Sequence, residues 1–163
     1  MAKAALSLGG NIGDVRATIA GALDLLEAAG VHVIARSSDY RTRPWGKTDQ
    51  PDFTNVSAVV ETTLPPHELL ATCLEVERRL GRVRHERWGP RLIDIDLIAY
   101  DGVRMDTTDL TLPHRHAHER GFVLIPLAEI APDLLIGDRT VAELAARFAN
   151  DPIEKLGRAG DLP

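Results

Sequence analysis

The chain has 163 residues, of which 44% are hydrophobic and 26% charged, and these values fit one globular domain with a sizeable core. Its formal net charge of −5 argues against general binding to nucleic acids or to a membrane surface. A single cysteine excludes a disulfide framework, and no stretch fits a secretory signal or a membrane span. We therefore expect a cytoplasmic protein whose single domain covers residues 1–163.

The first part of the chain reads as a strand followed by a helix. Residues 4–8 are a short apolar run, and a glycine-rich turn over residues 9–14 leads from it into a helical pattern that Gly30 ends. Asp14 is the expected N-cap of this helix. The glycine spacing matches neither the Walker pattern nor the complete dinucleotide pattern, so it indicates a tight turn.

The next elements are two strands, a long loop between them and a second helix. Strands are predicted over residues 31–40 and 53–63, separated by a segment over 41–52 that is rich in proline, glycine and polar residues. A loop of this length is a common mark of a binding loop. The proline pair at 65–66 begins the second helix, and Gly81 ends it.

A fourth strand is predicted over residues 92–100, followed by a turn and a short segment, 103–105, that can pair back on it. The remaining segments are an irregular histidine-rich stretch, an apolar run and a helix, at 111–119, 122–125 and 141–148. Strand, helix, two strands, helix and strand in this order predict an α+β ferredoxin-like sandwich, an antiparallel sheet with helices on one face.

The fourth strand places two acidic side chains on one face. Asp94 and Asp96 alternate with apolar residues and lie about 6.6 Å apart along an extended strand. Aspartate is depleted in strands, and a hard divalent cation would offset the repulsion of this pair. Arg87 and Arg91 flank the strand and can form paired hydrogen bonds to phosphate. The stretch predicts a nucleotide polyphosphate site; a solvent-facing strand with solubilising aspartates is the alternative.

The aromatic residues also gather near predicted loops. Of the two Trp, two Tyr and three Phe, four lie in or beside these loops: Trp45, Phe53, Trp88 and Phe122. An RNA-recognition sheet would instead carry aromatics on adjacent central strands. This distribution favours a pocket for a flat ligand.

A set of ordered motifs resembles the 6-hydroxymethyl-7,8-dihydropterin pyrophosphokinase family. The motifs are Leu8-Gly9-Gly10-Asn11-Ile12-Gly13-Asp14, Tyr40-Arg41-Thr42 with Pro44, Gln50-Pro51-Asp52-Phe53 with Asn55, Gly81-Arg82, Arg87-Trp88-Gly89-Pro90-Arg91, Asp94-Ile95-Asp96, Leu112-Pro113-His114, and Arg120 with Phe122. They extend over most of the chain, and an ordered set is more specific than any single motif. Departures include Gly10, where the family often has serine, and Leu74, which is polar in some relatives.

The resemblance implies an enzyme of folate biosynthesis that transfers a pyrophosphoryl group from ATP to the hydroxymethyl group of a reduced pterin and releases AMP. It implies two Mg²⁺ ions on the ATP triphosphate. The expected partners are ATP and 6-hydroxymethyl-7,8-dihydropterin, with no nucleic acid and no membrane, and we expect a monomer.

The resemblance also assigns roles to residues of this sequence. Asp94 and Asp96 would hold the metal ions, and Arg82 and Arg91 would act in catalysis with them by offsetting charge on the transferred group. The ATP-binding residues would be Glu77, Arg84, Arg91, Ile98, His114 and Arg120. The pterin-binding residues would be Thr42, Trp45, Phe53, Asn55, Trp88 and Phe122.

Two other functions remain open at this point. Another magnesium-dependent nucleotide transferase or hydrolase would share the paired aspartates and the arginines but would not need Asn55 and two stacking aromatics. A ferredoxin-like metabolite-sensing module would bind its ligand without turning over ATP. The alternating His114, His116 and His118 also fit a transition-metal site, which the hard-ion aspartates and the expected role of His114 disfavour.

Overall fold

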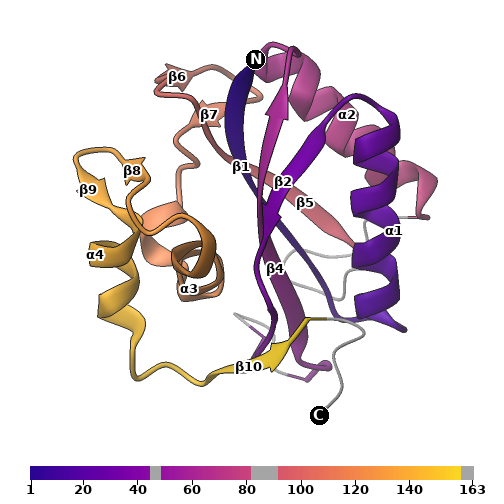
Figure 1. Ribbon diagram of the computed structural model, residues 1–163. Helices are drawn as coiled ribbons and strands as arrows, with labels where there is room; N and C mark the ends of the chain where they lie inside the picture. Colours follow the sequence, from indigo (N-terminus) through magenta and orange to yellow (C-terminus); the bar gives the residue numbers. More distant parts are fainter. Residues whose placement is uncertain (45–48, 82–91, 159–163) are drawn as a thin grey trace.

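The computed structural model describes residues 1–44, 49–81 and 92–158, which form a main sheet between two helical layers, and two small two-stranded sheets (Figure 1). The elements of the first half are β1 (Ala2–Gly10), α1 (Val15–Ala28), β2 (His32–Arg36), β3 (Asp39–Thr42), β4 (Phe53–Thr62) and α2 (Pro66–Arg79). The elements of the second half are β5 (Asp94–Tyr100), β6 (Met105–Asp106), β7 (Thr111–Leu112), α3 (Gly121–Ile130), β8 (Leu135–Ile136), β9 (Arg139–Thr140), α4 (Val141–Ala145) and β10 (Ile153–Gly157). Short 3₁₀ helices precede α3 and follow α4, at Ala117–Glu119 and Ala146–Phe148.

The main sheet is antiparallel, with strand order β10-β3-β4-β1-β5, and β2 also pairs with β4. The β2 and β3 strands lie one after the other along the same edge of β4: β2 pairs with Ala58–Glu61, and β3 with Phe53–Asn55. The single strand predicted over residues 31–40 is therefore two strands, and the predicted loop begins later than residue 41, because Arg41 and Thr42 belong to β3.

Local signals of the sequence determine where α1 and α2 begin and end. Asp14 Oδ1 accepts a hydrogen bond from the Ala17 amide at 3.1 Å, which is the predicted N-cap. The α2 helix begins at Pro66, where a missing amide hydrogen costs no helical bond. Gly30 and Gly81 follow these helices with φ of 86° each, a conformation that glycine adopts without strain.

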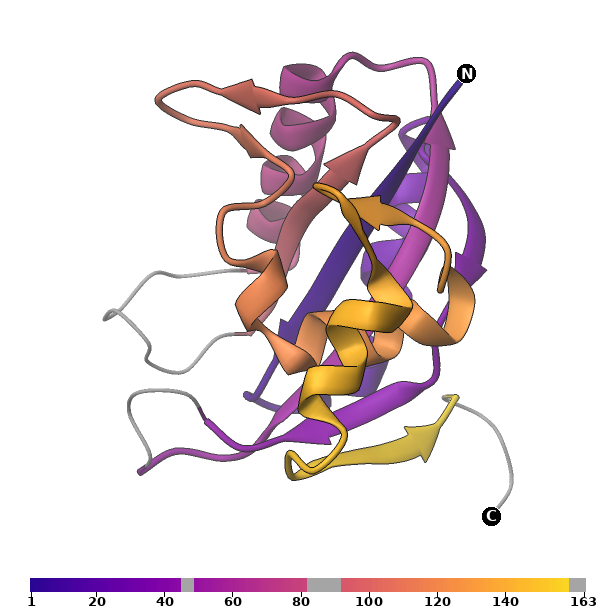
Figure 2. The same cartoon turned by 90° about the vertical axis from the view of Figure 1, so that its left-hand side faces the viewer.

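The predicted α+β class with an antiparallel sheet is confirmed, and the two helices of the predicted pattern lie on one face, but further helices cover the other face as well. The α1 and α2 helices pack on one face and α3 and α4 on the other, as Figures 1 and 2 show from two directions. The sheet thus has a first core on the side of α1 and α2 and a second core on the side of α3 and α4. Leu6 and Leu8 of β1 point into the first core, whereas Ala5 and Ile98 point into the second. A bulge in the β1–β5 pairing sets both Ile98 and Ala99 against Ala5.

The α3 helix was not predicted, although residues 122–125 stood out as apolar. It is apolar on nearly all sides and contains Pro126, so it has neither the amphipathic period nor the residue types of an ordinary surface helix. Burial between the sheet and α4 stabilises it instead. Among the described helices, none combines the length and the apolar character needed to cross a membrane.

The α3 helix is attached to the sheet near both of its ends. Near its start, Ser57 Oγ donates a hydrogen bond to the Val123 carbonyl at 3.1 Å. Near its end, the Glu129 carboxylate accepts hydrogen bonds from the Ser38 amide at 3.1 Å and from the Tyr40 hydroxyl at 2.7 Å. Burial would raise the pKa of Glu129, but these hydrogen bonds outweigh it and lower the pKa. The helix therefore has a fixed position on the sheet.

Leu124→Ala tests how much the second core contributes to stability. The Leu124 side chain is fully buried between α3 and the sheet, so its truncation should lower the free energy of unfolding by about 2 to 5 kcal/mol. The control is Leu135→Ala at a side chain that is 57% exposed, which should change it by less than about 0.5 kcal/mol. Urea denaturation followed by circular dichroism measures both, and equal losses would contradict the assignment of this core.

Candidate active site

Strand register brings three of the singled-out residues into one row across the sheet. Gly9 of β1 pairs with Asn55 of β4 on one side and with Asp94 of β5 on the other. Directly paired residues of an antiparallel sheet point to the same face. With two strand spacings of about 4.8 Å each, Asn55 and Asp94 lie about 10 Å apart across β1. Ser7 and Asp96 form the adjacent pair on this face.

Gly9 is required by the close approach of Asn55. A Cβ atom at this position would lie 2.2 Å from Asn55 Oδ1 and 3.2 Å from the Thr54 carbonyl oxygen. Such a contact would displace the Asn55 amide. The predicted tight turn over residues 9–14 is therefore partly wrong, because Gly9 and Gly10 are the last residues of a strand. Gly9 serves the close passage of a side chain over the backbone.

The Asn55 amide is oriented by a neighbouring threonine. Asn55 Nδ2 donates a hydrogen bond to Thr42 Oγ1 at 2.8 Å, and both residues are buried. Phe53, two residues earlier on β4, lies on the same face as Asn55 and is half-buried. Three residues predicted to contact the flat ligand thus occupy adjacent positions on β3 and β4.

At the other end of the row, one of two neighbouring carboxylates lies close to an arginine. Asp94 and Asp96 are half-buried at one end of β5, and Asp96 Oδ2 lies 3.8 Å from Arg120 Nη1. The Arg120 side chain is only 15% exposed, and its guanidinium carbon lies 5.6 Å from the centre of the Phe122 ring. Within the described part of the chain, its buried Nε atom has no hydrogen-bond acceptor. An anionic ligand beside Asp96 would supply the missing acceptor.

His114 is a neutral imidazole next to this arginine. Burial, followed by the charges of Arg120, His116 and Arg115, lowers the pKa of His114 from 6.5 to about 4. Its Nδ1 accepts a hydrogen bond from the His116 amide at 3.1 Å, so the ring proton is on Nε2. The His114 amide donates to the Ile98 carbonyl at 2.8 Å. His114 Nε2–H is thus a neutral donor beside β5.

Glu77 supports the strand that carries the aspartates. Its side chain extends from α2 and is 4% exposed, and Oε2 accepts a hydrogen bond from the Ile95 amide at 2.7 Å. Ile95 lies between the two aspartates in sequence, so this bond fixes the backbone from which both side chains project. Glu77 was predicted to bind ATP. The contact that the structure shows is instead with the backbone of β5, which it holds in place.

The structure places the predicted residues in two groups and leaves others undescribed. One group contains Thr42, Phe53 and Asn55, and the other contains Asp94, Asp96, His114 and Arg120, with Phe122 beside Arg120. The Ile98 side chain is 1% exposed and lies in the second core. Outside the described residues are Trp45, Arg82, Arg84, Arg87, Trp88 and Arg91.

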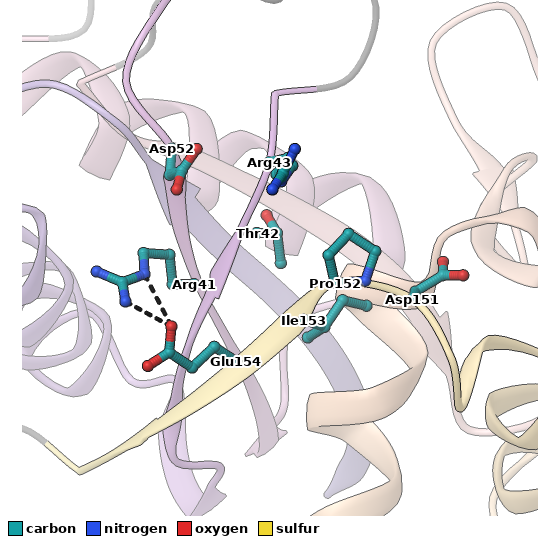
Figure 3. A pocket seen from close by; sticks show the side chains of 8 residues that line it. All are labelled: Arg41, Thr42, Arg43, Asp52, Asp151, Pro152, Ile153 and Glu154. Atoms are coloured by element: carbon teal, nitrogen blue, oxygen red, sulfur yellow. Dashed lines mark hydrogen bonds and ion pairs between the residues drawn. The ribbon is translucent and has the colours of Figure 1, made fainter.

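A separate cavity of about 530 Å³ lies at the outer edge of β3 (Figure 3). Its lining combines Thr42 with charged residues of both signs, and Arg41 forms an ion pair with Glu154 at 2.5 Å. Among the described residues that line it, Thr42 is the one predicted site residue. Because the described lining holds three acids beside Arg41 and Arg43, and Arg41 is paired with Glu154, this cavity does not have the character of a phosphate site.

A metal site of histidines has no support among the described residues. His116 and His118 lie near Glu119, at 3.0 and 3.9 Å, but no group of three metal-ligand side chains forms there or elsewhere in residues 1–44, 49–81 and 92–158. Sequence reasoning named Gly9 and Asn11 only as parts of a motif and gave neither a role of its own. Gly9 is the middle residue of the row, and Asn11 lies beside the row, where its side-chain amide donates to Gln50 and Pro51. Only the residues that they contact, which are distant in sequence, reveal these roles.

Comparisons with known proteins agree on one family. A family model described as 7,8-dihydro-6-hydroxymethylpterin-pyrophosphokinase matches residues 5–132. The 2-amino-4-hydroxy-6-hydroxymethyldihydropteridine pyrophosphokinase of Methylorubrum extorquens is 54% identical over 157 residues, which cover 96% of this chain and 99% of that protein. The protein of the same name from Haemophilus influenzae is 37% identical and covers 96% of this chain and 99% of its own length.

The fold also resembles a solved structure. The HPPK-DHPS of Plasmodium falciparum, in the crystal structure with SDX-DHP, superimposes with a TM-score of 0.70 over 91% of this chain at 16% identity. At this identity the likeness concerns the fold alone. The chain spans 44% of that structure's length.

The pKa of His114 gives a test of the site's electrostatics. Because the unfolded chain takes up this proton near pH 6.5 and the folded chain only near 4, His114 should make the free energy of unfolding rise with pH between about 4 and 6.5. Chemical denaturation across this range should show a weaker rise for His114→Asn than for the original chain. An NMR titration midpoint of the His114 ring near 6.5 would contradict the burial argument.

Proposed function

Because the chain belongs to the 7,8-dihydro-6-hydroxymethylpterin pyrophosphokinase family, we propose that it transfers the pyrophosphoryl group of ATP to the hydroxymethyl group of 6-hydroxymethyl-7,8-dihydropterin, in folate biosynthesis. The observation that carries the proposal is the row Asn55–Gly9–Asp94. It sets an amide suited to a pterin about 10 Å from a carboxylate suited to a metal–nucleotide complex. The products are AMP and the pterin diphosphate.

At the nucleotide end, Asp94 and Asp96 fit a hard divalent cation. Both project from one face of β5 and supply carboxylate oxygens, the donors that Mg²⁺ prefers. A Mg²⁺ ion bound there supplies charge neutralisation on the phosphate oxygens of ATP. With only two protein carboxylates at this site among the described residues, oxygens of phosphate and water would have to complete the coordination, and we propose two ions, as the family resemblance implies.

Arg120, which lies beside Asp96, and the neighbouring His114 bind the phosphate chain directly. The Arg120 Nε–H has no acceptor within the described residues, and a phosphate oxygen beside Asp96 satisfies it. Neutral His114 donates from Nε2 without adding a positive charge to compete with Arg120. Glu77 and Ile98 act through the backbone, Glu77 by holding the Ile95 amide and Ile98 by holding the His114 amide.

At the pterin end, Asn55 recognises the amide-like edge of the ring. Its Nδ2 is oriented by Thr42, which leaves Oδ1, above the bare Gly9 backbone, to accept from a pterin N–H. Phe53 of β4 and Phe122 of α3 supply the aromatic surfaces for stacking. A ring bound at Asn55 directs its hydroxymethyl group along the row toward Asp94.

The protein contributes to this reaction mainly by positioning the substrates and stabilising charge, and no side chain forms a covalent bond with them. The hydroxymethyl oxygen attacks the β-phosphorus in line and gives up its proton, the bond from that phosphorus to the α-phosphate oxygen breaks, and AMP leaves without a covalent enzyme intermediate. Arg82 and Arg91 would stabilise the charge on the transferred group, Arg84 the nucleotide, and Trp45 and Trp88 the pterin. These five roles rest on the family resemblance, because the residues lie outside the described ranges.

The wider setting follows from the sequence and the family. We propose that residues 1–163 form one catalytic domain that acts as a monomer in the cytoplasm, with ATP and the pterin as its partners. The relative from Methylorubrum extorquens matches this chain over 99% of its own length.

Product analysis distinguishes this reaction from its alternatives. The purified chain with Mg²⁺, ATP and 6-hydroxymethyl-7,8-dihydropterin should form AMP and pterin diphosphate in equal amounts, as measured by anion-exchange chromatography. Release of ADP would indicate transfer of a single phosphate, and pterin-independent AMP formation would indicate a hydrolase. Binding without turnover would favour a metabolite sensor.

Asp94→Asn tests the proposed metal ligand. The amide keeps the size of the side chain but loses its charge, so kcat should fall by about a hundredfold or more at saturating Mg²⁺, with an unchanged circular dichroism spectrum. The matched control is Asp24→Asn on the exposed side of α1, which should retain full activity. Near-normal turnover by Asp94→Asn would refute the assignment.

A further inference from the structure

Asn11 joins two distant segments directly beside the proposed pterin site. It follows the last residue of β1, and its side-chain Nδ2 donates hydrogen bonds to Gln50 Oε1 and to the Pro51 carbonyl, each at 2.9 Å. The residue is 5% exposed, although it lies in a loop between a strand and a helix. A buried polar side chain with two long-range contacts indicates a specific role in positioning.

The chemistry of the two acceptors selects asparagine at this position. A carbonyl oxygen can only accept a hydrogen bond, so Asn11 must turn its nitrogen, and not its oxygen, toward Pro51. The same nitrogen carries a second hydrogen for Gln50 Oε1. Aspartate has nearly the same shape but no donor, and it would set a negatively charged oxygen against two oxygen acceptors. Serine or alanine would reach neither.

The contact acts on the segment that leads into Phe53. Gly10 pairs with Thr54, so Asn11 lies one position beyond the last β1–β4 pair, at the level of Phe53. Gln50 and Pro51 come just before Phe53 in the chain and are themselves half-buried or exposed. Asn11 therefore extends the attachment of β4 to β1 past the last strand pair, at the end of β4 where Phe53 lies.

We propose that Asn11 is a positioning residue that fixes residues 50–53 against the end of β1, so that the Phe53 ring is in place before the pterin binds. The inference rests on the proposed function for its kinetic consequence but not for its structural one. A slot that is formed in advance costs less ordering on binding. Loss of the contact should therefore weaken pterin binding, whereas the step of phosphoryl transfer and the binding of ATP at β5 should change little.

Asn11→Ala tests the proposal with two independent measurements. Hydrogen exchange of the backbone amides in residues 49–54 should become about tenfold faster or more, because two hydrogen bonds that restrain this segment are lost. The KM for the pterin should rise by about tenfold, with kcat and the KM for MgATP within about twofold of the original values. Asn11→Asp should raise the pterin KM further, because it adds repulsion.

Two variants serve as comparison. Asn150→Ala removes the same side chain at an exposed position and should change neither exchange at 49–54 nor the kinetics. Gln50→Ala removes only one of the two acceptors of Asn11 and should have a smaller effect. When it is combined with Asn11→Ala, the rise in pterin KM should be less than the product of the separate rises, because both changes remove the same bond.

Each other result has a definite meaning. Unchanged exchange at 49–54 and unchanged pterin KM in Asn11→Ala would overturn the proposal. So would a fall in kcat alone, which indicates direct catalysis, or exchange that accelerates uniformly over the chain together with a lower Tm, which indicates general destabilisation. If the original chain forms no pterin diphosphate, the proposed function fails, whereas local exchange in Asn11→Ala still decides whether Asn11 holds the segment.

Discussion

The site depends on the close packing of a side chain against bare backbone at the centre of the sheet. Gly9 lies between β4 and β5, and only the absence of a Cβ there lets the Asn55 amide extend over β1 without a clash. The same backbone pairs with Asp94 on its other side. The proposed positions for a flat ring and for a metal–nucleotide complex are therefore separated by a distance that the strand spacing determines. The helices and loops add groups to a frame that three strands define.

Local patterns predicted the parts of this frame that depend on neighbours in sequence. The alternation around Asp94 and Asp96 placed both carboxylates on one face, and Asp14, Pro66 and Gly81 marked helix ends that the structure confirms. The resemblance to a family, drawn from ordered motifs, is confirmed by the comparisons. It supplied the expected roles of the residues, which spacing alone leaves open between several magnesium-dependent reactions.

What sequence reasoning missed depends on contacts between distant residues. The α3 layer has no amphipathic period, because the helix is buried between the sheet and α4. Strand β10 is recognisable only through its pairing with β3, more than a hundred residues earlier. The glycines of β1 resembled a turn because the partner that requires Gly9, Asn55, comes from another strand. Asn11 was part of a motif, but its acceptors lie about 40 residues away.

The two attachments of α3 have a mechanical consequence. Arg120 is the N-cap of α3 and Phe122 is its second residue, and hydrogen bonds at Val123 and Glu129 hold the helix to the sheet near both of its ends. A shift of the helix would carry the cation and the aromatic ring together. In the proposed reaction these two residues serve different substrates, so one attached helix carries a group for each, which would give the two substrates a direct route to thermodynamic coupling.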